Sequence, residues 1–516
     1  MKMPFNLTIA LLTLLPFVTL TAQTADDAPR RGCRVGTPGE QFAPHRAQWT
    51  AGSENPYLGN RRQLVVLASF QDYDFAEGHD ATLATWNNIF NTEGYHEAPF
   101  TGSVHDYFLA QSYGQFNLVF DLMLVELPGP RSKYQSTYGD DENSQYMVDD
   151  IVDKLETEGI DWSLYDWDGD TFVDQLLIIF AGKGMNDGGG SGTIWPHQWW
   201  LSQHMDQETT APNDHRSYRT VSSGDKTYYV DCYCCVQEMP HSGEPGLTFG
   251  TICHEYSHCF GFPDFYNGST QYVGQWDLMD YGNNNGDGLC PCGYSAHERM
   301  LMGWLAPKEL TRGTTISQMA ALSDEPQAYL VRNNGAENEY YIVENRQQKG
   351  WDEKLPGSGV VIFHVDYDKA LWESLSASVN TSGKKRYCIF PANNSSKNSA
   401  QKFWAYPYGM TNAQGKTLTL NDELTNTSAP AATLNNANAD GRLLMSKPIT
   451  QIAVDVNGMA SFVFMDSEVT LVDGVPAMQP SPEHWYSPDG RQQGKKATRK
   501  GIYIHQGKKV VAGESK

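Results

Sequence analysis

The sequence predicts an α/β (α+β) domain, then a β-rich domain, and finally a small β module at the C-terminus. Three observations support this fold class. Apolar runs typical of buried strands alternate with helical segments over residues 61–305, short runs of alternating hydrophobicity dominate residues 306–466, and residues 485–516 hold short apolar runs in a basic context. A chain of 516 residues with 40% hydrophobic residues, 13 Trp and 27 Tyr can bury a sizeable core.

The first residues have the composition of an export signal. Lys2 precedes an apolar run from Leu7 to Leu20, and Ala22 offers a small residue for cleavage, so residues 1–22 are predicted to be a signal peptide. We expect a secreted or cell-surface protein. No membrane span is predicted, because no other segment approaches 18 consecutive apolar residues. Residues 23–60 lack a sustained period and are predicted to be an N-terminal segment, either a pro-peptide or a flexible leader.

The α/β domain is predicted over residues 61–305 from alternating strand and helix patterns. Ser103 is a suitable N-cap for one of the helices. The predicted strands are 63–70, 116–125, 175–180 and 227–237, and the predicted helices are 80–90, 103–111, 146–158 and 248–260. The glycine-rich 188–192 is expected to be a mobile loop, and the aromatic run 194–200 after it to line a cleft, with His197 packed rather than ligating.

The last of these helices carries the sequence His-Glu-x-x-His. His254 and His258 are four residues apart, so a helix places both imidazoles on one face, where they can share one metal ion. Zinc suits this site, because a catalytic zinc takes three protein ligands and keeps one position for water. Glu255 is then placed to act as general base toward that water. The alternative is a helix with two buried histidines and no metal.

A third ligand is predicted a few residues further on. Gly261 is where such a helix would end in a left-handed conformation, and Pro263 prevents it from resuming. The chain can therefore turn back and bring Asp264 to the metal as an oxygen ligand. A later carboxylate such as Glu298 remains an alternative third ligand, and the alternative for Asp264 is a solvent-facing side chain.

Two further stretches complete the predicted chemistry. In Trp276-Asp-Leu-Met-Asp-Tyr281, Met279 could lie in a turn beneath the metal site, as in metzincin proteases, and Tyr281 could direct its hydroxyl at the metal or a developing oxyanion; core packing is the alternative for Met279. The second stretch surrounds Gly169 and predicts a calcium site, with a solvated acidic turn as the alternative. Its carboxylates are Asp166, Asp168, Asp170 and Asp174.

On these motifs, the chain resembles the immune inhibitor A family of secreted bacterial metalloproteases, which are metzincin-like but carry Asp in place of the usual third His. The resemblance runs from about Leu64 to Asp366. It implies a metzincin-like fold and a secreted zinc endopeptidase that acts on proteins or peptides through Glu255. Besides the metal motif and the acidic stretch, the segments that carry it are Gly102–Asn117, Ile194–His197, Ser295–Arg299, Gly303–Leu305, Glu344–Arg346 and Leu355–Val360.

A different class of function remains open, a catalytically inactive, calcium-stabilised surface adhesin or carbohydrate-binding protein. An intact Glu255 disfavours it, because a binding protein has no need of a base. The net charge of −23 argues against nucleic acid or an anionic membrane surface as a partner, since both would repel the chain.

The nine cysteines are concentrated around the metal motif, with seven between Cys232 and Cys292. In an exported protein they predict disulfide bonds that fasten active-site loops; a second, structural zinc is the alternative, and an odd count leaves a thiol over. Cys33 could therefore block the metal until a cut, for example at Arg61-Arg62 ahead of the first strand, removes it; pairing with Cys388 is the alternative.

The C-terminal part is predicted to hold a linker, 467–484, and the small module, 485–516. The β-rich domain ahead of them is predicted from runs at 328–331, 339–344, 359–365, 386–390 and 452–464. The module has eight Lys and Arg against two acidic residues, a reversal of the chain's sign. It is similar to the C-terminal sorting domains of Bacteroidetes, which implies the type IX secretion machinery as a possible partner; a basic β module without an address role is the alternative.

Overall fold

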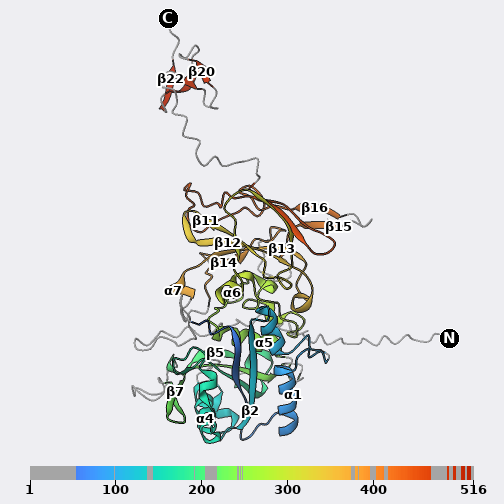
Figure 1. The fold of residues 1–516 in the computed structure, drawn as a ribbon, viewed down its shortest axis with the longest axis vertical. Helices are drawn as coiled ribbons and strands as arrows, with labels where there is room; N and C mark the ends of the chain where they lie inside the picture. Colours follow the sequence, from blue (N-terminus) through green and yellow to red (C-terminus); the bar gives the residue numbers. More distant parts are fainter. Residues whose placement is uncertain are drawn as a thin grey trace, which may run out of the picture.

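The structure is a computed structural model, and the first half of the chain folds around a five-stranded sheet (Figure 1). The described residues are 54–97, 99–135, 143–190, 192–203, 218–240, 248–372, 378–381, 383–395, 403–411 and 417–465, a few single residues, and the strands within 485–512. The sheet has the order β2-β1-β4-β8-β5. Its strands are β1 (Gly59–Ser69), β2 (Phe116–Glu126), β4 (Leu176–Lys183), β5 (His197–Trp200) and β8 (Cys232–Met239).

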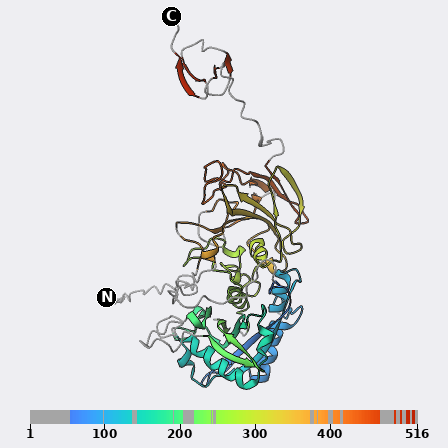
Figure 2. The ribbon, with the colours of Figure 1, turned by 60° about the vertical axis from the view of Figure 1, so that its left-hand side comes forward.

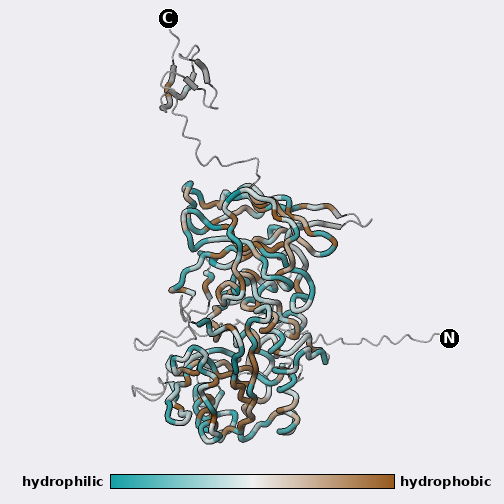
Figure 3. Tube along the Cα trace, in the orientation of Figure 1, coloured by the Kyte–Doolittle hydropathy of each residue, from teal (hydrophilic) through white to brown (hydrophobic). Residues whose placement is uncertain are grey.

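The central strands are apolar because both faces of the sheet are covered. β1, β2, β4 and β8 pair in parallel, and β5 joins β8 antiparallel at the edge. From Leu64 to Ala68 every residue of β1 is buried, and so is every residue of β4 up to Gly182. Parallel strands covered on both sides require such continuous apolar runs, and Figure 3 shows the hydrophobic colour gathered along this sheet.

The helices predicted in this region are confirmed within a few residues. Ser103 caps α2 through a capping box with Asp106, as the sequence predicts for its N-cap, and α4 ends at Gly159 with φ 71°. The helices are α1 (His79–Asn91), α2 (Val104–Gln111), α3 (Arg131–Tyr134), α4 (Ser144–Glu158), α5 (Phe249–Cys259), α6 (Ala296–Leu301) and α7 (Lys369–Trp372).

The strand predicted over 227–237 is wrong as a single element. The chain forms β7 (Lys226–Val230) and β8, which belong to different sheets and are separated by Asp231. The Asp231 carboxylate accepts hydrogen bonds from the backbone and hydroxyl of Ser202, which holds the chain where it changes sheet. β7 instead joins β3 (Phe172–Val173) and β6 (Arg219–Ser223).

The β-rich part is built on a sheet of order β14-β13-β12-β11-β9, whose alternating residues face two different cores. Tyr340 and Ile342 of β12 point into the core shared with the first half of the chain, whereas Tyr341 and Val343 point into a second core. This sheet therefore connects the two halves, with α6 lying between it and the first sheet (Figures 1 and 2). Its strands are β9 (Lys308–Glu309), β11 (Tyr329–Asn333), β12 (Ala336–Arg346), β13 (Gly359–Asp366) and β14 (Tyr387–Ile389).

The second core is closed by a three-stranded sheet of order β10-β18-β17. The run predicted over 452–464 is a hairpin, which turns at Gly458 with φ 79°. These strands are β10 (Thr314–Met319), β17 (Ile449–Val454) and β18 (Ala460–Phe464), and a separate hairpin joins β15 (Tyr408–Thr411) to β16 (Thr417–Asn421).

The residues just before β1 already belong to the folded core. Asn55 donates to the carbonyl of Met302, and the Trp304 indole donates to the carbonyl of Tyr57. The suggested cut at Arg61-Arg62 ahead of the first strand is therefore wrong in its placement. Both arginines lie inside β1, paired with β2, and Arg62 also forms an ion pair with Asp121 of that strand.

The last residues form a small four-stranded antiparallel sheet of order β20-β19-β21-β22, in agreement with the predicted β module. Its strands are β19 (Trp485–Tyr486), β20 (Gln492–Gly494), β21 (Gly501–His505) and β22 (Lys508–Ala512). The predicted signal peptide 1–22, Cys33 and the linker 467–484 lie outside the described residues. In the described part of the chain, no helix is long and apolar enough to cross a membrane.

Candidate metal centre

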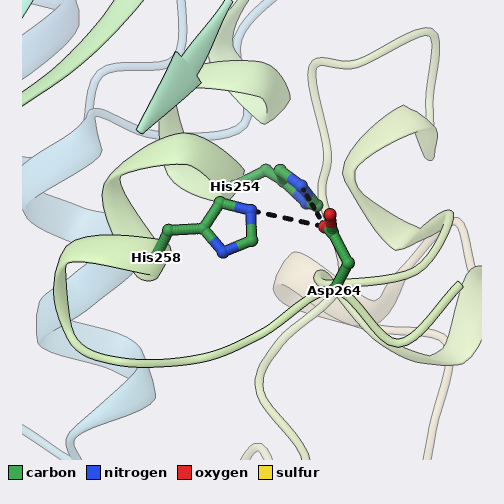
Figure 4. Close-up of side chains that lie close together, drawn as sticks. All are labelled: His254, His258 and Asp264. Atoms are coloured by element: carbon green, nitrogen blue, oxygen red, sulfur yellow. Dashed lines mark ion pairs between the residues drawn. The ribbon is translucent and has the colours of Figure 1, made fainter. Parts of the chain in front are cut away.

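The helix α5 carries the two histidines and ends where the sequence predicts. Gly261 has φ 96°, its amide donates to the carbonyl of His258 (2.9 Å), and the Phe262 amide donates to Ser257 (3.4 Å). These two bonds form a Schellman motif, which requires a left-handed residue and so favours glycine. The turn reverses the chain and brings Asp264 back toward the last turn of α5 (Figure 4).

The two imidazoles are oriented by backbone carbonyls. His254 Nδ1 lies 2.9 Å from the carbonyl oxygen of Leu278, and His258 Nδ1 lies 2.6 Å from that of Phe262. Because a carbonyl oxygen only accepts, each Nδ1 carries the proton and donates it. Both Nε2 atoms therefore face Asp264 Oδ1, at 3.2 Å from His254 and 3.3 Å from His258 (Figure 4).

This arrangement of donor atoms fits a cation. Asp264 is only 1% exposed, and apart from its contacts with the two histidines neither of its carboxylate oxygens has a hydrogen-bond partner in the described residues. Burial opposes its ionisation, but attraction to His258 and hydrogen bonding to both histidines outweigh that effect and lower the pKa of Asp264 to about 2. A buried carboxylate opposite two imidazole nitrogens is the donor set of a mononuclear zinc site, and the three ligand atoms lie within 4.8 Å of one another.

Glu255 lies beside this group with one oxygen unused. Its side chain is 8% exposed, and Oε2 has no hydrogen-bond partner in the described residues. A carboxylate in this state can accept a proton from a water held at the metal position.

The segment with Met279 lies directly under the two histidine-bearing turns. Besides the contact of Leu278 with His254, the carbonyl of Met279 accepts from the amide of Phe265 (2.8 Å), the neighbour of Asp264. Met279 is fully buried. The segment therefore contacts the helix and the turn that carry the three candidate ligands, and the role of Met279 in a turn beneath a metal site stays a prediction.

Two predicted residues lie outside the group of three. Tyr281 is half-buried and directly precedes the 3-10 helix Gly282–Asn284. Glu298, the alternative third ligand, is fully buried at the start of α6, where its Oε2 accepts from the amide (2.7 Å) and hydroxyl (3.0 Å) of Ser295. The structure thus brings together His254, His258 and Asp264, and uses Glu298 as part of a capping box.

Sequence reasoning missed two acids that shape the Met279 turn and one aromatic beside the ligands. Asp277 accepts from the amide of Met279 (2.9 Å), and Asp280 Oδ2 accepts from three consecutive amides, 272–274, at 2.8 Å each. Burial raises the pKa of Asp280 to about 7. Tyr266 stacks on His254, with ring centroids 6.5 Å apart. The positions of Asp277 and Asp280 on either side of Leu278 and Met279 could have indicated that these acids shape the turn. No local sequence pattern predicts the contact of Tyr266 with His254.

The acidic stretch forms a second group of possible ligands. Asp166, Asp168 and Asp170 offer oxygens within 4.8 Å of one another, around Gly169 with φ 81°. Asp174 is not in that group. It is buried, its Oδ2 accepts from the amide of Trp167, and its Oδ1 has no hydrogen-bond partner in the described residues. Burial raises the pKa of Asp174, and the three neighbouring aspartates add to the effect.

The structure contains no disulfide among the eight described cysteines, in contrast to the predicted bridges. These thiols are all buried, and several of them contact other polar groups. Cys259, next to His258, lies within hydrogen-bonding reach of Cys232 and Cys234 on β8, and Cys388 contacts His364. The second zinc is not supported either, since the groups of possible ligands in the described residues include no cysteine.

His197 is packed as predicted, with Nε2 3.0 Å from the hydroxyl of Tyr233.

The fold and the candidate metal centre together define the class of protein. It has a mixed α/β domain in which a helix carries His-Glu-x-x-His, and a carboxylate from the following turn completes the group of possible ligands. Residues 62–302 match the family model of the immune inhibitor A peptidase M6 catalytic domain, so this part of the chain is similar to that peptidase family. The chain is also similar to Immune inhibitor A of Bacillus thuringiensis subsp. alesti, with 25% identity over 292 residues. That alignment covers 48% of this chain and 40% of the relative, so the chain spans less than half of the relative's length.

Proposed function

We propose that this protein is a secreted, zinc-dependent endopeptidase with a metzincin-like catalytic domain. The observation that carries the proposal is the buried group of His254, His258 and Asp264, with the unpartnered Oε2 of Glu255 beside it. A zinc ion bound there would polarise the substrate carbonyl and acidify a water. The match of residues 62–302 to a peptidase family model supports the same reaction class.

In this proposal the chain's own residues divide the work. The carbonyls of Leu278 and Phe262 hold the imidazoles in the tautomer that ligates through Nε2. Glu255 takes a proton from the attacking water and gives it to the leaving amine. Tyr281 is proposed to donate its hydroxyl to the oxyanion.

The edge strand of the first sheet supports a peptide substrate. β5 is the terminal strand of this sheet, and α5 packs against both β5 and β8. An extended peptide can pair with an edge strand through backbone hydrogen bonds, which would place it near the metal ligands with little dependence on its sequence.

We further propose a structural calcium ion at Asp166, Asp168, Asp170 and Asp174. The convergence of three carboxylates and the unpartnered Oδ1 of the buried Asp174 support it, because close acidic groups are stabilised by a hard cation. Export by the predicted signal peptide and a sorting role for residues 485–516 remain part of the proposal.

The test is metal analysis combined with cleavage of casein, with and without a chelator. Wild type should bind one zinc per chain and lose activity on chelation. Glu255→Gln should keep the zinc and the fold but lose cleavage, because an amide cannot accept the proton, whereas His258→Ala should lose the zinc.

Activity of Glu255→Gln within about tenfold of wild type would reject the assignment of the base. A stoichiometric zinc in His258→Ala would place the metal elsewhere. Wild type that binds no zinc when zinc is supplied, and that shows no cleavage, would favour the adhesin alternative.

A further inference from the structure

The segment that carries Asp264 is held from outside the helix that carries the histidines. Asp264 forms a parallel β-bridge with Ser378, and Asn267 Nδ2 donates to the carbonyl of Asn380 (2.7 Å). Both partners belong to the β-rich part of the chain, more than a hundred residues further along. The side of the metal centre opposite α5 is therefore built on residues 378–381.

Asn380 is the centre of this contact. It is fully buried, and its Nδ2 donates to the carbonyls of Phe265 (2.7 Å) and Tyr387 (2.8 Å). Its Oδ1 accepts from the amides of Arg386 (2.8 Å) and Tyr387 (2.9 Å). Two donors and two acceptors are the full capacity of an amide side chain, so Asn380 has one orientation and fixes the carbonyl next to Asp264.

Tyr387 extends the contact to the turn beneath His254. Its ring lies on Phe265, with centroids 3.9 Å apart. Its hydroxyl lies 3.0 Å from Asp277 Oδ2 and 2.8 Å from Ser295 Oγ. Asp277 in turn accepts from the amide of Met279, so the same tyrosine contacts both segments that support the ligands.

The Asp264 carboxylate depends on this support. Apart from its contacts with the two histidines, it has no hydrogen-bond partner in the described residues. Among the described residues, no side chain other than the two histidines orients the carboxylate, so its position follows from its backbone, which Ser378 and Asn380 hold.

We propose that Asn380 is a positioning residue for the metal centre, so that the β-rich part of the chain contributes directly to metal affinity. The proposal rests on the metal site of the proposed function. Groups that orient metal ligands typically change affinity ten- to a hundredfold when they are removed.

The experiment compares the zinc affinity of Asn380→Ala with that of a matched control, Asn438→Ala. Asn438 is also a buried asparagine of the β-rich part, with Nδ2 donating to the carbonyls of Leu444 (3.2 Å) and Met445 (2.8 Å), but its side-chain contacts stay within residues 438–445. Zinc dissociation constants are measured on the full chain by competition with a chromogenic chelator, and Tm is measured on the zinc-free protein.

We expect Asn380→Ala to weaken zinc binding by about ten- to a hundredfold. Both variants should lower the Tm of the zinc-free protein by similar amounts. Asn438→Ala should nevertheless bind zinc within about threefold of wild type, since Asn438 contacts neither segment that holds the ligands. An unchanged affinity in Asn380→Ala, or an equal loss in Asn438→Ala, would overturn the proposal.

If Asn380→Ala does not fold, Tyr387→Phe decides the question, because it keeps the ring on Phe265 and removes only the hydroxyl. A severalfold loss of zinc affinity supports the proposal, and wild-type affinity rejects it. A failure of the proposed function can be distinguished from a failure of the positioning role. If the proposed function is wrong, wild type binds no zinc, or His258→Ala still binds zinc.

Discussion

At the scale of single residues, the candidate metal centre gives different surroundings to two carboxylates, Asp264 and Glu255, which are nine residues apart in the sequence. Burial opposes the ionisation of Asp264, but the two imidazoles beside it outweigh that effect and lower its pKa to about 2. Glu255 leaves one oxygen without a partner and so can take up a proton. In the proposed reaction, the helix thus supplies the base and the turn after it supplies the anionic ligand.

The residue-scale prediction concerns the hydroxyl that would stabilise the oxyanion. Tyr281→Phe should lower kcat by about ten- to a thousandfold without changing zinc content, if its hydroxyl donates in the transition state. Kinetics with a peptide substrate and metal analysis measure both quantities. Tyr266→Phe is the comparison, because Tyr266 is the tyrosine stacked on His254. A loss confined to Tyr266→Phe would transfer the role to that residue, and an unchanged kcat in both variants would leave neither as the donor.

At the scale of elements, local patterns predicted most of the helices and central strands. The buried runs of β1 and β4, the N-cap at Ser103 and the helix end at Gly261 all depend on residues within one or two turns of each other. The division of 227–237 into β7 and β8 did not follow from such signals, because it depends on the pairing of β8 with β4, which lies far from it in the sequence. A continuous apolar run cannot show where a chain changes sheet.

The same limit applied to the metal centre. His254, His258 and Asp264 lie within eleven residues, so helical spacing and a turn were enough to predict their convergence. The support from Asn380 and Tyr387 joins residues more than a hundred positions apart, and no local pattern marks it. The thiols show the converse error, since their clustering in sequence predicted disulfides, whereas the eight described cysteines are buried and form no disulfide with one another.

The element-scale prediction concerns the acidic loop between the 3-10 helix Trp162–Tyr165 and β3. Calcium should raise Tm, and Asp168→Ala with Asp170→Ala should abolish that response before it affects catalysis, because a bound ion stabilises the folded state by its binding free energy. Thermal scans with calcium and with a calcium chelator measure the effect.

A matched control for the loop is Glu156→Ala with Glu158→Ala, which removes the same charge from exposed positions of α4. It should keep the calcium response. A Tm that is independent of calcium in wild type would contradict a calcium site. If both double variants lost the calcium response equally, the response would be an effect of net charge and not of a specific site.

At the scale of the whole molecule, the two halves are joined by a buried polar network that is costly to expose. Arg346 is fully buried and pairs with Glu344 (3.0 Å) and Asp352 (2.7 Å), and it also donates to the carbonyl of Gly293 (2.9 Å). Breaking such a pair leaves an uncompensated buried charge. We therefore expect the catalytic part and the β-rich part to unfold together rather than as independent units.

His297 of α6 makes this junction sensitive to acid. It is fully buried among aromatic rings, with Nδ1 3.3 Å from the hydroxyl of Tyr340 and the Trp372 ring 5.1 Å away, and burial lowers its pKa to about 3. The folded protein keeps the imidazole neutral, while the unfolded chain takes up a proton below pH 6.5. Its contribution to stability is thus complete above pH 6.5 and is lost as the pH falls toward 3.

The prediction is a loss of about 2 kcal/mol from this residue between pH 7 and pH 5. Urea unfolding at several pH values measures it, as the difference in slope between wild type and His297→Gln, whose stability should fall less steeply with acid. His105→Gln replaces another buried histidine, bonded to Asn117 on β2, and controls for the loss of packing alone. Parallel stability curves for wild type and His297→Gln would show that His297 does not titrate on unfolding, and the acid sensitivity would then belong to the carboxylates of the junction.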